Sequence, residues 1–224
     1  MSKTQLWDAT SVVLATNREQ VRAAAAELGL QSWDGSGKLL RLRAPLDEAS
    51  LRETLEATSA LEETILWLDG FGSLATWYAM IAARLGVGVV LATAFGSGGL
   101  PALEQLVVNA LGEGVQRSRL GSYLRLVGGL LNLRPWPHQP VAGEVAFELS
   151  HSESDGGLDP EEFGFSRRRR VGPSSDRGWV ERCLEQLRLE PTQARVERVV
   201  EAARKTAGLS ELELLNCLGE AELV

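Results

Sequence analysis

Two apolar runs, separated by one segment of helical length, place the strongest constraint on how this chain can fold. ETILWLDG at 63–70 and VGVVLATAF at 87–95 each read as a buried strand, and LATWYAMIAARLG at 74–86 reads as the helix between them. Strands that are apolar on both faces and joined by a helix are typical of a parallel sheet covered by helices on both sides. With the right-handed crossovers that such units adopt, the pattern predicts an α/β fold.

The same alternation extends toward the N-terminus. SVVLAT at 11–16 is predicted to be a buried strand, and Asn17 is placed to cap an alanine-rich helix that stops near Gly29. A turn through glycines 35 and 37 leads into an extended segment, after which Asp47 can cap a helix over 46–61. The chain is therefore expected to begin strand, helix, strand, helix.

The C-terminal third changes character. A glycine-rich loop with a helix (96–114), a helix or strand pair (119–133) and a late strand (143–150) complete a main domain over residues 1–150. Residues 151–177 are polar and charged, which predicts a linker or mobile loop. Residues 178–224 read as two or three amphipathic helices, a small appendage expected to pack on the main domain.

Charge and cysteine content exclude several classes of function. Lys and Arg total 23 against 30 Asp and Glu, a net charge of −7, which argues against a direct nucleic-acid surface and favours protein partners. Cys183 and Cys217 lack metal-ligand spacing, so neither a metal site nor a disulfide framework is expected. Without an export signal or a transmembrane-length apolar run, the protein is expected to be cytoplasmic and soluble.

Two segments carry a resemblance to a known family. The run ILWLDGFGSLATWYAMIAARLGVGVVLATAFGSGGLPAL and the later run GVQRSRLGSYLRLVGGLLNLRPWPH resemble the ATPases that drive type IV pili and type II secretion, the PilT, PilB and GspE family. The late strand that contains Glu148 is similar to a strand of that family that ends in glutamate. The resemblance covers roughly residues 64–150 and implies a RecA-like sheet flanked by helices. The matched positions are Leu74, Thr76, Ala82, Val90, Leu91, Thr93, Gly114, Val115, Leu120, Ser122, Leu124, Arg125, Val127, Leu130, Arg134, Pro137 and His138.

The groups that would hold a nucleotide in that family are missing. A phosphate-binding loop needs glycines whose N–H groups face the phosphates, a Lys, and a Ser or Thr for Mg²⁺. Where the resemblance places this loop, the chain reads SVVLATNREQVRAAAAELG, with no lysine and no GKT or GKS. GSGK at 35–38 leads into Leu39 and Leu40, so it is predicted to be a turn.

The family's catalytic positions are also replaced. Its strand-end glutamate corresponds to Gly70, and Asp69, one residue earlier, would leave the strand on the opposite face. Asp69 either contacts a ligand at the strand end or caps the turn at Gly70. Thr93 matches the family's LST motif, but the histidine that follows the motif there is Phe95 here. These degenerate positions predict no cofactor, no metal and no hydrolysis.

The function expected from these losses is that of a catalytically inactive ATPase-like protein, a binding or regulatory module for a type IV pilus or secretion machine, monomeric or dimeric. Two alternatives stay open: a pseudo-RecA protein of DNA-damage tolerance or cell-division control, and a Rossmann-like domain that binds a small ligand near Asp69 and Thr93. A run of four arginines is either solvated or contacts an acidic partner or anionic lipid. The run consists of Arg167, Arg168, Arg169 and Arg170.

Overall fold

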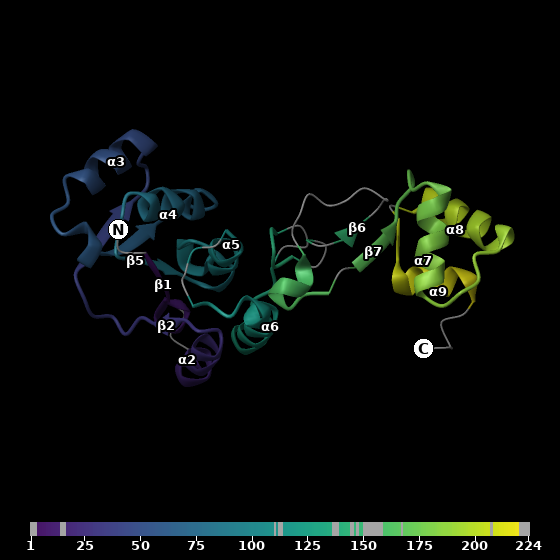
Figure 1. Cartoon of the computed structure of the whole chain (residues 1–224), viewed down its shortest axis with the longest axis horizontal. Coiled ribbons are helices and arrows are strands. Elements are labelled where there is room, and N and C mark those ends of the chain that lie inside the picture. The colour runs from purple at the N-terminus through teal and green to yellow at the C-terminus, as the bar shows by residue number, and fades with distance from the viewer. Residues whose placement is uncertain are drawn as a thin grey trace. The chain divides into compact units, whose positions relative to one another are not determined.

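The chain folds into two compact units. One comprises Met1–Glu144 with Glu162–Phe165, and the other comprises Val145–Glu161 with Ser166–Val224 (Figure 1). The computed structural model describes residues 4–13, 17–109, 111, 114–135, 139–143, 146, 148–149, 159–166, 168–206 and 208–219.

The first unit is built on a five-stranded sheet in the order β2-β1-β5-β4-β3, and each neighbouring pair is parallel. The predicted α/β fold with a RecA-like or Rossmann-like parallel sheet is therefore confirmed. The register places Gln5 opposite Val89 and Asp8 opposite Ala92, so β1 and β5 end together in the middle of the sheet. The strands are β1 (Gln5–Asp8), β2 (Gln31–Ser32), β3 (Leu39–Arg43), β4 (Ile65–Asp69) and β5 (Val89–Ala92).

Helices in two groups accompany this sheet. Helix α4 contacts α3 and α5, whereas α2 contacts α1 and α6 (Figure 1). Asp47 caps α3 as predicted, since its Oδ1 accepts the N–H of Ser50 at 2.8 Å. Asn17 precedes α2 as predicted but has a left-handed φ of 47°, and its Nδ2 donates to Leu130 O instead of the helix end. The helices are α1 (Thr10–Val13), α2 (Arg18–Glu27), α3 (Glu48–Glu56), α4 (Leu74–Arg84), α5 (Leu103–Val108) and α6 (Leu120–Leu131).

The first strand is not where the sequence pattern placed it. The predicted strand at 11–16 is wrong: the strand is β1, and Thr10–Val13 forms the short helix α1. The Asp8 side chain accepts the N–H of Thr10 at 2.9 Å, and this local bond turns the chain as soon as β1 ends. A β-branched run that reads as a strand is thereby held in a helical turn, because long-range pairing and turn chemistry override its propensity. Residues 14–16 lie outside the described part.

Three alanines lie on the buried face of α4, together with Tyr78 and Ile81. Ala75, Ala79 and Ala82 are fully buried, whereas Trp77 is 52% exposed. Leu74, one turn before it, is 54% exposed. The spacing of the alanines determines which side of the helix meets the rest of the unit, and Trp77 lies on the other side.

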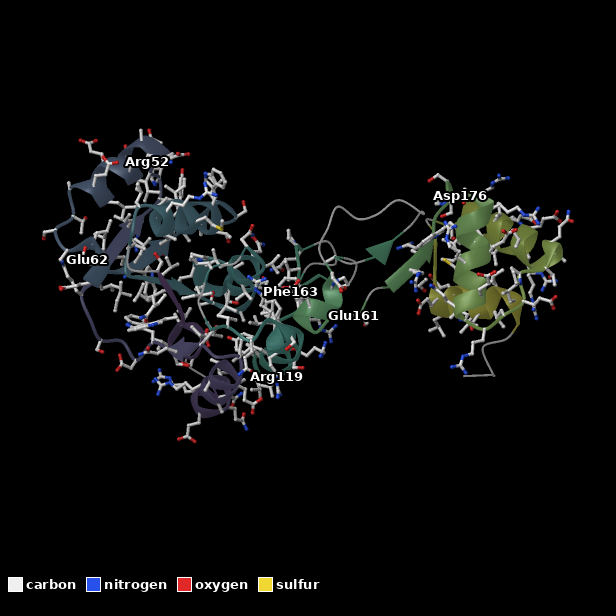
Figure 2. The ribbon with its side chains drawn as sticks, viewed as in Figure 1. Arg52, Glu62, Arg119, Glu161, Phe163 and Asp176 are labelled. Atoms are coloured by element: carbon white, nitrogen blue, oxygen red, sulfur yellow. The ribbon has the colours of Figure 1, made fainter. Side chains whose placement is uncertain are left out.

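The short segment Glu162–Phe165 also belongs to the first unit, although it lies later in the chain than the rest of that unit. Two glycines allow backbones to meet there: a Cβ on Gly121 of α6 would lie 2.2 Å from Gly164 O, and Gly164 itself has a φ of +72°. Phe163, labelled in Figure 2, is buried at 1% exposure, and the Arg117 guanidinium lies 5.9 Å from the centre of its ring. Arg117 also pairs with Glu162 at 2.9 Å. Segment 162–165 therefore packs on α6 although the sequence placed it in a linker.

The second unit has its own core. Strand β7 (Arg168–Val171) pairs parallel with β6 (Glu148–Leu149) and antiparallel with β8 (Leu209–Ser210). The late strand that we predicted thus joins this small sheet, and β7 replaces part of the predicted linker. The predicted amphipathic helices of the tail are confirmed, and the structure gives them as α7 (Arg177–Gln186), α8 (Gln193–Lys205) and α9 (Glu211–Leu218).

These tail helices cover one another. We expected their apolar faces to pack on the main domain, but these faces are buried within the second unit. Their N-termini are capped by side chains as soluble helices require: Asp176 accepts the N–H of Trp179 at 2.7 Å, and Ser210 forms a capping box with Glu213. The core consists of Val171, Trp179, Val180, Cys183, Leu184, Val196, Val199, Ala203, Leu209, Leu214 and Leu218.

Candidate functional site

The candidate site lies at the C-terminal ends of β1 and β5. The chain passes from β1 outward to β2 at one edge of the sheet, and then returns from β3 at the opposite edge through β4 to β5. Open α/β sheets bind ligands beyond the C-terminal ends of their strands, where the strand order changes direction in this way. This end of the sheet is therefore where the chemistry of the first unit should be sought.

Asp8, the last residue of β1, is a fully buried acid. Its Oδ1 accepts the N–H of Thr10 at 2.9 Å and the hydroxyl of Thr10 at 2.5 Å. Its Oδ2 has no hydrogen-bond partner within the described part of the chain. Burial raises the pKa of the Asp8 carboxyl, and the hydrogen bonds from Thr10 oppose that rise.

Thr10 connects three segments that are distant in sequence. Its hydroxyl donates to Asp8, accepts the N–H of Ala94 at 2.9 Å and lies 3.3 Å from the hydroxyl of Tyr123 on α6. Burial, together with the nearby Asp8 carboxylate, raises the pKa of Tyr123 well above its ordinary value. The end of β1, the segment after β5 and helix α6 are thus held together by one buried polar cluster.

A second buried acid, Glu104, lies in the first turn of α5. Its Oε2 accepts the N–H of Phe95 at 3.0 Å, and its Oε1 accepts Nε2 of Gln139 at 3.1 Å. Burial raises the pKa of Glu104 to about 7. This carboxyl therefore changes charge near neutral pH, which an exposed glutamate does not do.

A pocket of about 510 Å³ opens beside these groups. Residues that follow β4 and β5 meet there with α4 and α5. Its described lining contains hydroxyl, amide and apolar groups but no charged side chain. Such a lining suits a small uncharged molecule and offers no cation to a phosphate. The lining residues are Gly72, Ser73, Thr76, Phe95, Gly96, Leu100, Ala102, Gln105, Gln139 and Pro140.

Asp69 is engaged elsewhere on the sheet. Its Oδ2 accepts from Nη2 of Arg41 at 2.6 Å and from Nη2 of Arg43 at 3.1 Å, both on the neighbouring strand β3. The hydrogen bond from Arg41, followed by that from Arg43, lowers the pKa of the Asp69 carboxyl. Gly70 follows with a left-handed φ of 78°. Asp69 is thus an ion-pair partner of β3, and within the described residues it forms no hydrogen bond with the Asp8 cluster.

Thr93 and Phe95, by contrast, lie beside the buried acids. Thr93 is fully buried, and its hydroxyl donates to Ser97 O at 2.7 Å. Phe95 has a left-handed φ of 59° and is the residue whose N–H meets Glu104. The 96–99 glycine loop that follows is a kinked 3-10 segment, Ala94–Gly99, with positive φ angles at several residues. Two of the predicted positions therefore belong to the site.

The arginine run belongs to the second unit. Arg167 and the side chain of Arg168 lie outside the described part. Arg169 and Arg170 are half-buried in β7, and the carbonyl of Arg170 accepts Nε1 of Trp179 at 3.0 Å. The run is thus partly a structural strand. His138 and His151 are also outside the described residues.

The thiols, possible metal ligands and hydrophobic helices add no further site. Cys183 and Cys217 are free, and burial raises the pKa of Cys183 to about 11, so its reactive thiolate form is disfavoured. In the described ranges, no group of three or more His, Cys, Asp or Glu residues is arranged to hold a metal ion. Among these residues, no helix combines the length and apolar content needed to cross a bilayer.

Comparison with known proteins leaves the family open. No protein-family model matches the chain. A search of curated proteins also finds no match. The resemblance to pilus and secretion ATPases therefore rests on the sequence of residues 64–150 alone.

Sequence reasoning missed the residues that organise this site. Asp8 and Thr10 form an Asp-x-Thr motif after a short strand, and this motif is a known signal for a side-chain-capped turn. Glu104 stands in the apolar run LPALEQLVV, where a single acid on a buried face is a sign of a functional or structural carboxyl. Tyr123 carried no such signal, because its partner lies more than a hundred residues away.

Proposed function

We propose that this chain is a catalytically inactive, RecA-like binding module. The observation that supports it is that backbone N–H groups after β1 already have hydrogen-bond partners within the protein. Phosphate-binding loops leave the N–H groups between the first strand and its helix free to face the nucleotide. Here the N–H of Ala9 donates to Ala92 O, that of Thr10 to Asp8, and those of Val12 and Val13 to Ala9 O. These donors are already occupied.

The charge at this position also disfavours a triphosphate. Asp8 lies where the family's phosphate loop would begin, Glu104 is nearby on α5, and the pocket lining described above has no Lys or Arg. Phosphoryl transfer depends on cations and oriented donors that stabilise charge on the transferred group. A buried acid without such cations would instead repel the negatively charged phosphates.

We assign the module to a protein partner in a type IV pilus or secretion machine, including an active motor ATPase. This part rests on the resemblance and on the surface of the first unit. Leu74 and Trp77 are exposed one turn apart on α4, and exposed aromatic residues often anchor protein interfaces. The mechanism is occupancy of an interface, with no bond broken.

Calorimetry on the purified full chain tests the absence of nucleotide chemistry. Titration with Mg-ATP and Mg-ADP is expected to give no saturable heat, and phosphate release is expected to equal that of an Asp8→Asn variant. Saturable binding accompanied by hydrolysis that Asp8→Asn or Asp69→Asn reduces would overturn the proposal.

Affinity purification from the source organism, with quantitative mass spectrometry, tests the partner. Enrichment of pilus or secretion components over an unrelated tagged protein is expected. Recovery of polymerase or division proteins instead would assign the module to DNA-damage tolerance or division control.

Small-molecule binding is a second candidate, because the pocket beside Phe95 lies where α/β sheets hold ligands. Its uncharged lining predicts that a nucleoside, not a nucleotide, would bind. Titration with adenosine and guanosine beside the corresponding triphosphates distinguishes it: heat from nucleosides alone favours this role.

A further inference from the structure

We propose that β3 is a docking edge to which the partner adds an acidic, extended segment as a further strand of the sheet. This inference rests on the proposed binding role and names the surface and the chemistry of its partner. Strand β3 ends the sheet order, and all five of its residues pair with β4 on one side. Its other side faces no strand of the described sheet.

The backbone of β3 presents free groups along this open side. Lys38 O accepts the N–H of Ile65, and the N–H of Ala44 donates to Asp69 O. Because backbone direction alternates along a strand, the N–H and C=O groups of residues 40 and 42 also face β4. Those of Leu39, Arg41 and Arg43 face away, and no backbone hydrogen bond to them is found in the described part of the chain. An edge of this kind is a template for strand addition.

Charged residues on edge strands usually discourage pairing, but here they are drawn away from the edge. Both arginine side chains reach across to Asp69 on β4, Arg41 at 2.6 Å and Arg43 at 3.1 Å. The Arg41 guanidinium also lies 5.2 Å from the ring centre of Trp67 on β4. Because these contacts hold both guanidinium groups toward β4, the outer backbone is left uncovered. Leu39, at the start of the strand, is 41% exposed and adds an apolar contact.

The charge of this edge selects an acidic occupant. Two arginines share one aspartate, so the cluster keeps a net positive charge in a chain whose net charge is −7. The Arg41 and Arg43 side chains are 53% and 75% exposed. They stand two residues apart on the same face, so an added strand with acids at alternate positions places its carboxylates opposite them. On the other face, Leu40 and Leu42 are half-buried and fit apolar residues at the intervening positions.

Labelled peptides test the proposal on the full chain. The first alternates valine and glutamate over about ten residues, which matches a strand's period of two. The second replaces each glutamate by lysine. The third replaces one central valine and the glutamate after it by proline, with one glutamate added at its end to keep the charge, which removes a backbone donor on each edge of the peptide. Fluorescence anisotropy is expected to show saturable binding of the first peptide only. Hydrogen exchange is expected to slow at the amides of Leu39, Arg41 and Arg43 when it binds.

Variants of the protein separate the contribution of the two arginine charges from that of the open backbone of β3. The double change Arg41→Glu with Arg43→Glu is expected to weaken binding of the glutamate peptide by about tenfold or more and to favour the lysine peptide. Leu39→Pro keeps both charges but removes one outward N–H at the first strand position, and is also expected to weaken binding. Arg52→Glu is the matched control: this exposed arginine on α3, labelled in Figure 2, pairs with Glu48 on its own helix.

Three results would overturn the inference: equal binding of the proline peptide, unchanged affinity in the double variant, or exchange protection that falls outside β3. Circular dichroism of each variant establishes that it is folded before its affinity is measured. Failure of the docking edge can be distinguished from failure of the proposed binding function. A partner from cells that still binds the double variant would refute the docking edge and leave the binding role intact, whereas ATP hydrolysis would refute the role whatever the peptides do.

Discussion

The main-chain N–H of Phe95 donates to the buried carboxyl of Glu104 across 3.0 Å, from the segment after β5 to the first turn of α5. Phe95 has a φ of 59°, a left-handed conformation that is uncommon for an aromatic residue. The hydrogen bond helps to hold it there. The segment after β5 is therefore held in place by the protein's own side chain.

Glu104→Gln is expected to flatten the pH dependence of stability. The pKa of Glu104 rises from 4.5 to about 7 on folding, so between these values the native state binds more protons than the unfolded state. Stability therefore falls as pH rises through this window, and the loss is complete above it. At about 1.4 kcal/mol per pH unit, the full effect is about 3 kcal/mol. Glutamine still accepts the Phe95 N–H and carries no charge, so the variant gains stability over the wild type at pH 8.

Urea unfolding midpoints between pH 5 and pH 8 measure this difference. Glu53→Gln, on the exposed side of α3, is the control and should follow the wild-type curve. Asp8 contributes a slope of the same sign, because its pKa is also raised, so Glu104→Gln should reduce the slope without abolishing it. Parallel curves for the wild type and Glu104→Gln would contradict the prediction.

Thr10→Val is expected to destabilise the first unit by about 1–3 kcal/mol. Valine has nearly the same shape but removes the hydroxyl that donates to Asp8 and accepts the N–H of Ala94. Both buried groups then lose a partner. Thr58→Val is the comparison, since in the described part of the chain that hydroxyl donates to the carbonyl of Thr54, one turn earlier at the end of α3. Equal stability of the two variants by urea unfolding would mean that the buried cluster does not stabilise the fold.

Asp69 is expected to titrate below the usual range of an aspartate. Because its folded pKa is lowered, its stabilising contribution is present above the unfolded pKa of 3.8 and is lost as pH falls through the folded value. Arg41→Gln should raise this pKa more than Arg43→Gln, since the hydrogen bond from Arg41 has the larger effect. Carboxyl chemical shifts followed by NMR against pH give the comparison. A normal Asp69 titration in the wild type would show that the ion pairs do not persist in solution.

Leu184→Ala is expected to destabilise the second unit by about 2–5 kcal/mol, because it opens a cavity among residues of the core around α7. Hydrogen exchange should speed up across α7, α8 and α9, with little change at the amides of β4 and β5. Leu212→Ala removes the same atoms from a residue that is 65% exposed, so it should cost much less. Equal acceleration in both units would instead mean that they unfold together.

The candidate site shows which functional positions could be predicted from the sequence and which could not. Thr93 and Phe95 were singled out because they match a motif of the ATPase family that this sequence resembles, at the end of an apolar strand. Asp69 was singled out because it ends an apolar strand. Its partners, however, are arginines of β3, which lie 28 and 26 residues earlier in the chain. Asp8 was missed because the strand it ends is only four residues long. The β-branched run after it has the higher strand propensity and was therefore predicted to be the strand.

Local sequence determined the α/β class, the parallel sheet, the capped helix after Asp47 and the helical character of the C-terminal segment, because apolar period and capping residues act within a few neighbours of the chain. Tertiary structure alone decided which carboxyls are buried, which strand lies at the open edge and where Trp77 points. Those outcomes depend on desolvation and on partners brought from distant segments: Tyr123 to Thr10, Phe95 to Glu104, and Asp69 to two arginines. Such long-range pairings leave no periodic trace in a single sequence.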